Sequence, residues 1–360
     1  MSDSQNLQSA DLVRMTGTNS PDSLRVLFVG PIAGTSGHRL AAFRRLGHLV
    51  TAVNPYEAFR GNSVLHAWAF KTGALGFSGL VERLVGAAIA SKRFDLAWVE
   101  SGDIISAACV ETMRRSCGAV VLYHIDNCFA PRDGRRWRLL FAALTHYDLF
   151  VAPRDRCVDE ALRSGARRAL RVNMSADEVV HRRPELSDED LRIYASEVAF
   201  VGTWMPERGP FLLELVRRGV PLKIFGPRWR RAQEFEALGD RVVDERLADA
   251  EYVKAISATK VGLVLLSKGN LDLHTTRSFE IPAVGTLLCA ERSIDHERLY
   301  RENEEAVFWS NAAECADLCF ALLADERRRS RVAEAGRRRV AANRSFNEAS
   351  IFYVLSYLGF

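Results

Sequence analysis

The start of the chain predicts a βαβ unit, which restricts the possible folds more than any other feature of the sequence. Residues 24–30 form a short apolar run with β-branched members that ends at a Gly-Pro pair, and a loop over 31–37 follows. Apolar residues then recur at helical spacing over 38–46, and a second apolar run, 48–53, comes directly after Gly47. A strand, a loop, a helix and a second strand in this order are typical of a parallel sheet covered by helices.

The same alternation continues along the chain and predicts two successive series of strands and helices. In the first half we expect strands at 94–99, 119–124, 149–152 and 169–172 and a helix at 154–163. In the second half we expect strands at 197–202, 221–226, 261–267 and 285–290, and helices at 211–218, 250–257, 312–323, 326–342 and 347–358. The sequence therefore predicts an α/β protein with two Rossmann-like, doubly wound domains. Ligands of such sheets lie outside the carboxyl ends of the strands, so we expect them in a cleft that the two domains face.

A length of 360 residues exceeds one ordinary core, which also favours two domains. The charged segment 181–191, which contains Pro184, is typical of a crossover between them. We therefore expect one domain at 24–190, a second at 191–345, and a terminal helix at 346–360 that packs back on the first domain. Residues 1–23 are polar and match neither a signal peptide nor a transit peptide, so we interpret them as a disordered tail.

The composition restricts the class of partner. Lys and Arg number 49 against 45 Asp and Glu, and this small excess does not indicate nucleic acid. No segment approaches ~18 uninterrupted apolar residues, so we expect no membrane span. The seven cysteines contain no CxxC pair and suit a reducing compartment. Cys315 and Cys319 share a helix face without other candidate ligands nearby, so we predict no metal site and a cytoplasmic location.

The segment 261–290 contains the clearest candidate site. A buried strand ends at Ser267, a polar loop follows over 268–274, and a short helix begins near Thr275 and carries Arg277 and Glu280 in its first turns. The start of such a helix offers unpaired N–H groups and a positive dipole end, which suit a phosphate. Glu280 lies where its carboxylate would accept the hydroxyls of a ribose. A capped helix with solvated Arg and Glu side chains fits the same spacing.

A resemblance to a known family bears on these two alternatives. Residues 277–286, RSFEIPAVGT, resemble the R-x-F-E-I-P-A-x-G segment of glycosyltransferases related to the CgeB-like spore-maturation proteins, within the GT-B (group-1) enzymes. Further segments of that family are similar to 200–208, 225–229, 300–309 and 335–340, in the same order. The resemblance covers most of the second half and, in the first half, rests on residues 34–47 and the turn after them. It implies the GT-B fold, with the acceptor side in the first domain and a nucleotide sugar bound by the second.

The resemblance also implies roles for single residues. Glu280 corresponds to the second acid of a Glu-x7-Glu pattern and would hold the donor ribose. The first acid falls at Asp272, where the shorter Asp stands in place of Glu. Arg208 resembles a basic residue that grips the donor diphosphate, with Arg277 or Lys268 as the second positive charge. Fixed cations would neutralise the leaving diphosphate without a metal ion. The further donor-binding candidates are Gly202, Gly226 and Ser278.

Candidate reacting groups in the first half follow the strand at 119–124. His124 would orient the acceptor hydroxyl or the donor sugar, and Asp126 would act as a base or orient His124. A strand-end histidine satisfied by backbone groups is the alternative. Gly34, Thr35 and Ser36 lie in the predicted loop after the first strand and would approach a ligand through backbone N–H groups. An ordinary turn between a strand and a helix is the weaker alternative.

Several arginine-rich runs need a separate interpretation. Residues 132–138 combine basic side chains with Trp137 and precede an apolar stretch, which would suit an anionic membrane surface that carries a lipid-linked acceptor. A solvated helix face is the alternative. The runs 326–329 and 337–339 are interleaved with Ala and Val on helices, so we interpret them as surface positions and not as a nucleic-acid patch.

The expected function is transfer of a hexose-type unit from a nucleoside diphosphate sugar to a hydroxyl acceptor: a glycan, a lipid-linked saccharide or a small molecule. The similarity to the Glu-x7-Glu enzymes implies retention of the anomeric configuration. No cofactor is expected beyond the nucleotide sugar as co-substrate. A non-hydrolysing nucleotide-sugar epimerase and a catalytically silent sugar-nucleotide-binding partner protein are the alternatives. The sequence specifies neither the sugar, the base nor the acceptor.

Overall fold

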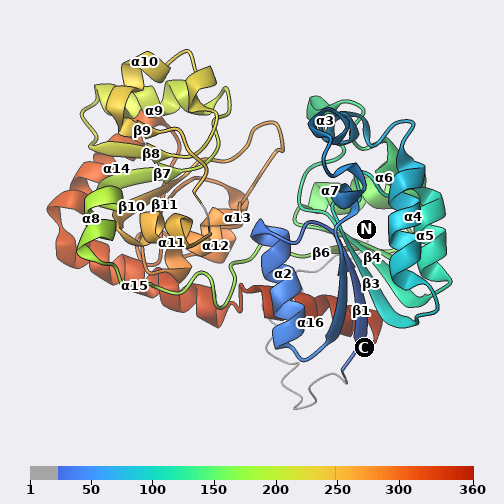
Figure 1. Cartoon of the computed structure of the whole chain (residues 1–360). Helices are drawn as coiled ribbons and strands as arrows, with labels where there is room; N and C mark the ends of the chain where they lie inside the picture. The colour runs from blue at the N-terminus through green and yellow to red at the C-terminus, as the bar shows by residue number, and fades with distance from the viewer. Residues whose placement is uncertain (1–22, 248) are drawn as a thin grey trace. The chain divides into compact units, whose positions relative to one another are not determined.

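The computed structural model describes residues 23–247 and 249–360, which form two compact units (Figure 1). The first unit extends to Asn173 and also contains Asn347–Phe360, whereas the second is Met174–Phe346. Almost all of the tail predicted at residues 1–23 lies outside the described residues. None of the helices in the described part of the chain combines the length and the apolar character that crossing a bilayer requires.

The first unit is built on a parallel six-stranded sheet in the order β2-β1-β3-β4-β5-β6. Its strands are β1 (Arg25–Val29), β2 (Leu49–Val53), β3 (Phe94–Glu100), β4 (Cys117–Tyr123), β5 (Leu149–Ala152) and β6 (Ala169–Arg171). Val26 and Val29 of β1 are completely buried although they point to opposite faces of the sheet, because helices cover both faces. The continuous apolar runs of the sequence follow from this double cover.

Helices form two layers on this sheet. One core contains side chains of α4 (Ser78–Ile89), α5 (Ala107–Arg114), α6 (Arg138–Ala143) and α7 (Asp155–Arg163), with η1 (Pro55–Phe59), α3 (Ser63–Thr72) and η3 (Leu144–His146) at its border. The short turn η2 (Pro131–Asp133) precedes α6. The other core contains α2 (Gly34–Arg45) and α16 (Asn347–Leu358), which lie side by side (Figure 1). Ile351 and Val354 of α16 are completely buried there with Val26 and Phe28. The last helix of the chain thus completes the core of the first unit.

The second unit repeats this architecture with a parallel six-stranded sheet in the order β12-β11-β10-β7-β8-β9. Its strands are β7 (Ser196–Val201), β8 (Leu222–Phe225), β9 (Val242–Val243), β10 (Thr259–Val264), β11 (Leu287–Glu291) and β12 (Val307–Trp309). The strand order reverses where β7 pairs with β10, since the chain extends from β7 toward β8 and later from β10 toward β11. Such a switch point is where open α/β sheets place their ligands.

Two cores flank this sheet as well. One contains α9 (Arg208–Arg217), α10 (Phe235–Leu238) and α14 (Ala312–Ala324), and the other contains α8 (Asp188–Tyr194), α11 (Asp249–Ser257), α12 (Arg277–Ala283) and α13 (Ile294–Leu299). The long helix α15 (Glu326–Ala342) contributes to both, and η4 (Trp229–Arg231) and η5 (Gly239–Arg241) join the short elements near β8 and β9. Completely buried aromatic side chains, among them Phe200, Trp229 and Phe308, fill these layers.

The boundary between the units differs from the predicted one at 190/191. Residues 174–190 belong to the second unit because polar contacts tie them to it. The Met174 N–H donates to Nε2 of His274 at 3.1 Å, and Asp190 accepts from Lys254 at 2.8 Å. The charge and the proline of this segment indicated a linker, whereas its contacts make it part of the second unit.

We predict that Ile351→Ala destabilises the first unit selectively. Truncating a completely buried isoleucine in a close-packed core costs about 2–5 kcal/mol. Leu162→Ala is the matched control, because Leu162 is 47% exposed on α7 and loses a similar volume. Hydrogen exchange measured peptide by peptide would show faster exchange in β1–β3 for Ile351→Ala only. Equal protection in the two variants would contradict the assignment of α16 to this core.

Candidate functional site

A pocket of about 400 Å³ opens at the carboxyl ends of β7 and β8 in the second unit. The loops after these strands, 201–203 and 225–228, form part of its wall, and Arg246, Leu247, Tyr252 and Arg277 complete it. Its volume falls within the range of about 300–1,000 Å³ that is usual for sites of small molecules and cofactors. The position beside the switch point of the sheet and the size of the pocket both indicate a ligand site.

Two glycines bring backbone close to this pocket. Gly226 has a φ of 143°, and a Cβ there would lie 2.3 Å from the carbonyl oxygen of Gly202. A Cβ at Gly202 would lie 2.7 Å from the ring of Phe200. Neither position therefore accepts a side chain without displacement of its neighbours. Both glycines were predicted to bind the donor, and both line the pocket.

The buried guanidinium of Arg208 lies at the switch point itself. Arg208 begins α9 and donates from Nη1 to the carbonyl oxygen of Thr203 at 2.8 Å and from Nη2 to that of Leu265 at 3.3 Å. It thereby links the loop after β7 to the loop after β10. Its Nε has no hydrogen-bond partner among the described residues. Burial, together with the nearby charge of Arg277, lowers the pKa of Arg208 to about 10, so the group stays protonated at neutral pH.

Further guanidinium groups give the pocket a positive wall. Arg277, the first residue of α12, donates from Nε to the carbonyl oxygen of Val201 and lines the pocket. Arg228 and Arg246, both exposed, line it as well. Sequence reasoning identified Arg277 but not these two, although Arg228 lies in the segment 225–229 that carried the resemblance. Guanidinium groups from separate elements that converge on one pocket are suited to an oxyanion such as a phosphate.

The start of α12 is not the open phosphate site that the sequence predicted. The N–H groups of Ser278 and Glu280 donate to the carbonyl oxygens of Thr275 and Thr276, at 3.0 and 2.9 Å. The Ser278 hydroxyl donates to Nε2 of His296 at 2.8 Å and accepts from the Thr275 N–H at 3.0 Å. Because Ser278 is completely buried and its hydroxyl is engaged, the predicted donor contact of Ser278 is not supported. The residue holds the first turn of α12 in place.

His296 fixes this turn through a buried imidazole. Its Nδ1–H donates to the carbonyl oxygen of Glu291 at 2.7 Å, so Nε2 is the acceptor for the Ser278 hydroxyl. Burial lowers the pKa of His296 to about 4, which keeps the ring neutral at physiological pH. The Tyr300 hydroxyl donates to the carbonyl oxygen of Ser278 at 2.6 Å from the other side.

Glu280 lies behind the pocket rather than in its wall. Its carboxylate accepts from the hydroxyl of Tyr252, and Tyr252 is the residue of this pair that lines the pocket. The other carboxylate oxygen lies 3.6 Å from Nε2 of His181, whose Nδ1 accepts from the Asp177 N–H at 2.8 Å. That arrangement places the proton of a neutral His181 on Nε2, facing Glu280. Sequence reasoning missed Tyr252 and His181, because one lies on an ordinary helix and the other in the predicted linker.

The two remaining candidates of the second unit lie in the loop before α12. The Lys268 ammonium pairs with the carboxylate of Glu291, which neutralises its charge. The Asp272 N–H donates to the carbonyl oxygen of Ser267 at 3.1 Å. The charge of Asp272 raises the pKa of the neighbouring Arg208 and so counters part of the effect of burial. Neither side chain lines the pocket.

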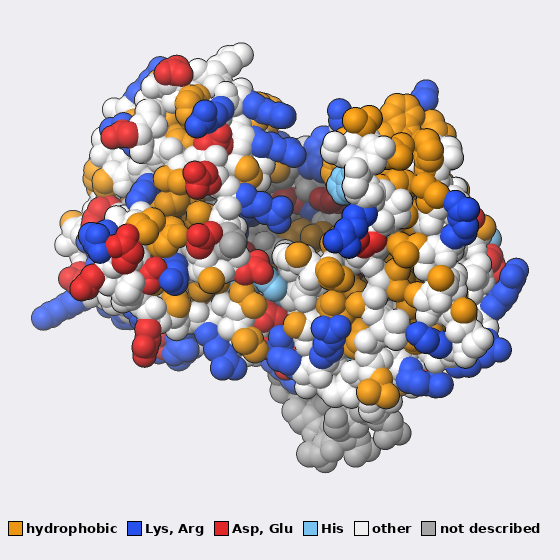
Figure 2. Space-filling model, in the orientation of Figure 1, with side chains coloured by type: hydrophobic (Ala, Val, Ile, Leu, Met, Phe, Trp, Pro, Cys, Tyr) orange, Lys and Arg blue, Asp and Glu red, His pale blue; other side chains and the backbone are white. Residues whose placement is uncertain are grey.

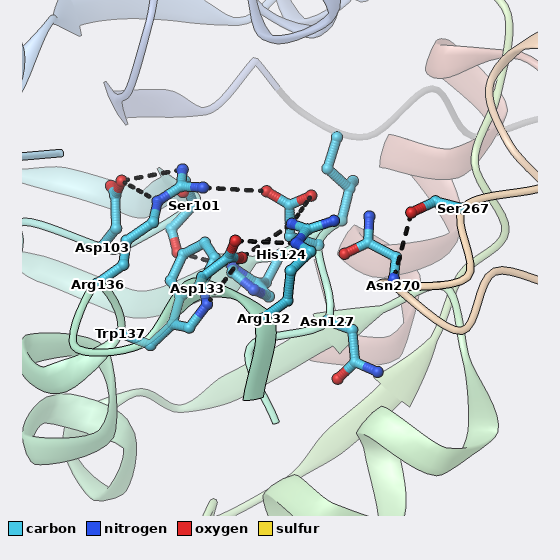
Figure 3. A network of polar contacts seen from close by, with 12 residues as sticks. Ser101, Asp103, His124, Asn127, Arg132, Asp133, Arg136, Trp137, Ser267 and Asn270 are labelled. Atoms are coloured by element: carbon cyan, nitrogen blue, oxygen red, sulfur yellow. Dashed lines mark hydrogen bonds and ion pairs between the residues drawn. The ribbon is translucent and has the colours of Figure 1, made fainter. Parts of the chain in front are cut away.

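His124 in the first unit is a buried, neutral imidazole (Figure 3). It follows β4, is 1% exposed, and donates from Nδ1 to the carbonyl oxygen of Ser101 at 2.8 Å. Its ring packs edge-on against Trp137, with 4.7 Å between the centroids. Burial lowers the pKa of His124, and Nε2 has no hydrogen-bond partner among the described residues. Nε2 keeps a lone pair without a partner among the described residues, and the atom itself is buried.

Asp126 belongs to a charged cluster beside this histidine (Figure 3). Its two carboxylate oxygens lie 3.9 Å from Nη2 of Arg132 and 3.8 Å from Nη1 of Arg136. Arg136 also donates to Asp103 at 3.2 Å, and the hydroxyl of Tyr56 donates to the same Asp103 oxygen at 2.6 Å. The cluster holds Asp126 in place while leaving its side chain about one-third exposed.

Gly34, Thr35 and Ser36 do not form the predicted loop. They make up the first turn of α2, which begins at Gly34 and not at residue 38. The Ser36 hydroxyl donates to the carbonyl oxygen of Pro31 at 2.6 Å, which closes the short connection from β1. The glycine and hydroxyl residues indicated a loop, but this local bond starts the helix earlier.

The structure also gathers cysteines that are distant in the sequence. Cys289 of β11 joins Cys315 and Cys319 of α14, and the three sulfur atoms lie within 4.8 Å of one another. Hydrogen bonds from the other two thiols lower the pKa of Cys319 to about 5. The sequence analysis missed the contribution of Cys289, since β11 and α14 meet only in the folded core. The group is completely buried and could hold a thiophilic ion only within that core.

Comparison with known proteins gives a sequence match in the second half. Residues 208–349 match a family model described as glycosyl transferase-like. The matched residues begin at Arg208, include the arginines of the pocket and end in α16. No curated protein sequence matches the chain.

Solved structures share the fold over nearly the whole chain. Sucrose-phosphate synthase of Thermosynechococcus elongatus superposes with a TM-score of 0.68 at 12% identity, covering 93% of this chain and 98% of that one. HepE of Anabaena in complex with UDP-glucose gives 0.62 at 13% identity, with 93% and 100% covered. A trehalose-6-phosphate protein of E. coli bound with UDP-2-fluoro glucose gives 0.62 at 11%, with 93% and 98% covered. The predicted α/β fold of the GT-B type, with two Rossmann-like units, is confirmed.

We predict that the second unit loses stability in acid through His296. Its folded pKa, about 4, lies below the unfolded value of about 6.5, so the unfolded chain binds more protons between these pH values. The contribution of His296 to the free energy of unfolding is therefore complete above pH ~6.5. As the pH falls toward ~4, up to about 3 kcal/mol of it is lost. Denaturant unfolding of wild type and His296→Gln at pH 7 and 4.5 measures the difference. An equally steep loss in the variant would show that other groups cause it; His146→Gln in the first unit serves as the control.

Proposed function

We propose that the chain is a glycosyltransferase that binds a nucleoside diphosphate sugar in the pocket of the second unit. The observation that carries the proposal is the convergence of Arg228, Arg246 and Arg277 on a pocket at the carboxyl ends of β7 and β8. The glycosyl transferase-like match, which spans these residues, and the GT-B fold support it. HepE, which shares the fold, was solved with UDP-glucose.

In this proposal the diphosphate lies against the arginines, and the backbone at Gly202 and Gly226 lets it approach closely. Breaking the bond between C1 of the sugar and the diphosphate oxygen leaves an additional negative charge on the nucleoside diphosphate. Arg277, already fixed by the carbonyl oxygen of Val201, stabilises that charge without reorganising. Tyr252, held by Glu280, faces the pocket and contacts the nucleoside, so that Glu280 acts on the ribose side through Tyr252.

The acceptor hydroxyl supplies the new bond to C1 and gives up a proton. We assign the orientation of this hydroxyl to Nε2 of His124, whose lone pair has no other partner among the described residues. Asp126, held between Arg132 and Arg136, takes the proton or orients the acceptor. Asp272 contacts the transferred sugar in the proposal, as the first acid of the Glu-x7-Glu pattern.

Retention of configuration, the first finer feature of the proposal, rests on the similarity to the Glu-x7-Glu enzymes. Catalysis without a metal ion, the second, rests on the fixed cations that neutralise the leaving diphosphate. The acceptor is a hydroxyl on a glycan, a lipid-linked saccharide or a small molecule. Activity that survives removal of divalent ions with EDTA would support the second feature. The configuration of the product, read by NMR, tests the first.

We predict that Arg228→Ala combined with Arg246→Ala weakens UDP-glucose binding at least tenfold. Each charge-assisted hydrogen bond to a phosphate contributes about 1.5–3 kcal/mol, and both side chains line the pocket without supporting the core. Arg241→Ala is the control, because Arg241 lines a separate hollow of the same unit. Isothermal titration, after a thermal-shift screen of nucleotide sugars, measures the affinity. Equal affinity in all three proteins, or no nucleotide sugar that stabilises the chain, would refute the donor site.

Binding alone does not distinguish a transferase from its alternatives. Incubation with the stabilising nucleotide sugar and no acceptor separates them: an epimerised donor would identify an epimerase. With an acceptor library, release of nucleoside diphosphate coupled to a glycosylated product supports transfer. Tight binding without turnover under every condition would identify a silent binding partner.

We predict that His124→Ala and Asp126→Asn each lower kcat by about 100-fold or more, the range of a lost acid–base or orienting group. Donor affinity stays unchanged, because both residues lie in the first unit and the pocket in the second. His146→Gln, also in the first unit, is the control. Full turnover in both variants would remove these residues from the mechanism and leave the donor site intact.

A further inference from the structure

Helix α3 presents several large apolar side chains to solvent. Of its residues only Ala69 is buried, whereas Val64 is 76% exposed, Trp68 46% and Phe70 43%. A surface helix of a globular protein turns its apolar side chains to the core and its polar ones outward. Helix α3 turns Leu65 and Ala69 to the core, but packing within the first unit does not explain the apolar side chains that it also exposes.

The exposed surface continues beyond the helix. Leu75 and Phe77, in the loop from α3 to α4, are 38% and 37% exposed, and the Trp68 indole N–H donates to the carbonyl oxygen of Leu75 at 3.1 Å. We call Val64, Trp68, Phe70, Leu75 and Phe77 the α3 patch. Figure 2 shows hydrophobic side chains gathered on this part of the surface. Contiguous apolar patches of this kind mark binding surfaces for proteins or membranes.

Basic side chains border the α3 patch. Lys71 of α3 is exposed, and the guanidinium of Arg136 lies 3.9 Å above the ring of Phe70. A Cβ at Gly73 would lie 2.6 Å from the carbonyl oxygen of Arg136, so the basic segment 131–138 rests against the end of α3. Arg135 and Arg138 of that segment are exposed.

The acidic side chains near the α3 patch are paired with arginines. The exposed Lys71, Arg135 and Arg138 therefore leave the border of the patch positive. Asp133 accepts from Arg132 at 2.8 Å, and Asp103 accepts from Arg136 at 3.2 Å. Glu57 pairs with Arg60 at 3.3 Å. Aromatic and aliphatic side chains surrounded by basic ones match the interface of an anionic bilayer, where apolar groups enter the acyl boundary and Lys and Arg meet lipid headgroups.

We infer that the α3 patch docks the first unit on an anionic lipid bilayer. Val64, Trp68 and Phe77 enter the headgroup and acyl boundary, while Lys71, Arg135 and Arg138 contact the headgroups. The inference does not rest on the proposed glycosyl transfer, since vesicle binding needs neither donor nor acceptor. It commits to lipid because the border is positive; a protein partner or a second copy of the chain is an outcome of the test.

The experiment measures co-sedimentation of the full chain with vesicles of phosphatidylcholine alone and with phosphatidylglycerol added. We expect binding to the anionic vesicles only, and weaker binding as salt rises. Val64→Ser with Phe77→Ser should lower the partition coefficient about tenfold. Lys71→Glu with Arg138→Glu should lower it about 25-fold or more, since each basic residue contributes about fivefold near such a surface.

Matched controls lie in the second unit. Phe320→Ser removes an aromatic side chain that is 44% exposed on α14, and Arg327→Glu reverses an exposed charge on α15. Both should bind vesicles as wild type does. Circular dichroism checks that each variant is folded.

Three outcomes would overturn the inference. Equal binding to neutral and anionic vesicles would remove the charge argument, and unchanged binding of Val64→Ser with Phe77→Ser would remove the α3 patch. Concentration-dependent self-association that this double variant abolishes, with no binding to vesicles, would assign the patch to a second copy of the chain. If the chain bound no nucleotide sugar, the vesicle result would be unaffected.

Discussion

The loops at the carboxyl ends of the second sheet depend on one buried charged side chain, Arg208. The Arg208 guanidinium is withdrawn from water and held by carbonyl oxygens from the loops after β7 and β10, and these are the strands between which the sheet order reverses. Carbonyl acceptors lessen the cost of burial without cancelling the charge, and Arg277 nearby adds to it. Arg208 therefore places a fixed positive charge next to the pocket, with the carboxylates of Glu207, Asp272 and Glu291 nearby. The two glycines, the exposed arginines and Tyr252 line the pocket itself.

The parallel sheets were predictable because a strand buried on both faces leaves a continuous apolar run in the sequence. Helices such as α14 and α15 were predictable for a similar reason, since they are long and periodic. The region 56–90 was not: α3 exposes apolar residues beside its polar ones, so its period is weak. The strand β9 spans only Val242–Val243, which is too short to leave a pattern.

The candidate site was predictable where one segment specifies the chemistry and not where tertiary contact does. Arg277, Gly202 and Gly226 lie in local sequence patterns, and the structure places them at the pocket. Ser278 lies in the same pattern, yet its partner His296 comes from α13, which no local pattern indicates. In the same way, Tyr252 separates Glu280 from the pocket because α11 packs beside α12. Spacing identifies which side chains start a turn, but contacts between distant elements decide which of them a ligand can reach.

The return of α16 to the first unit has a consequence for biosynthesis. On the ribosome, residues 24–173 emerge long before Ile351, Val354 and Leu355, which fill the core next to Val26 and Phe28. One face of the first sheet therefore stays partly uncovered while the entire second unit is synthesised. Domains generally fold as units during synthesis, so the second unit is able to fold first although it comes later in the chain. Until α16 is added, the apolar side chains that it covers in the folded protein stay exposed in the nascent chain.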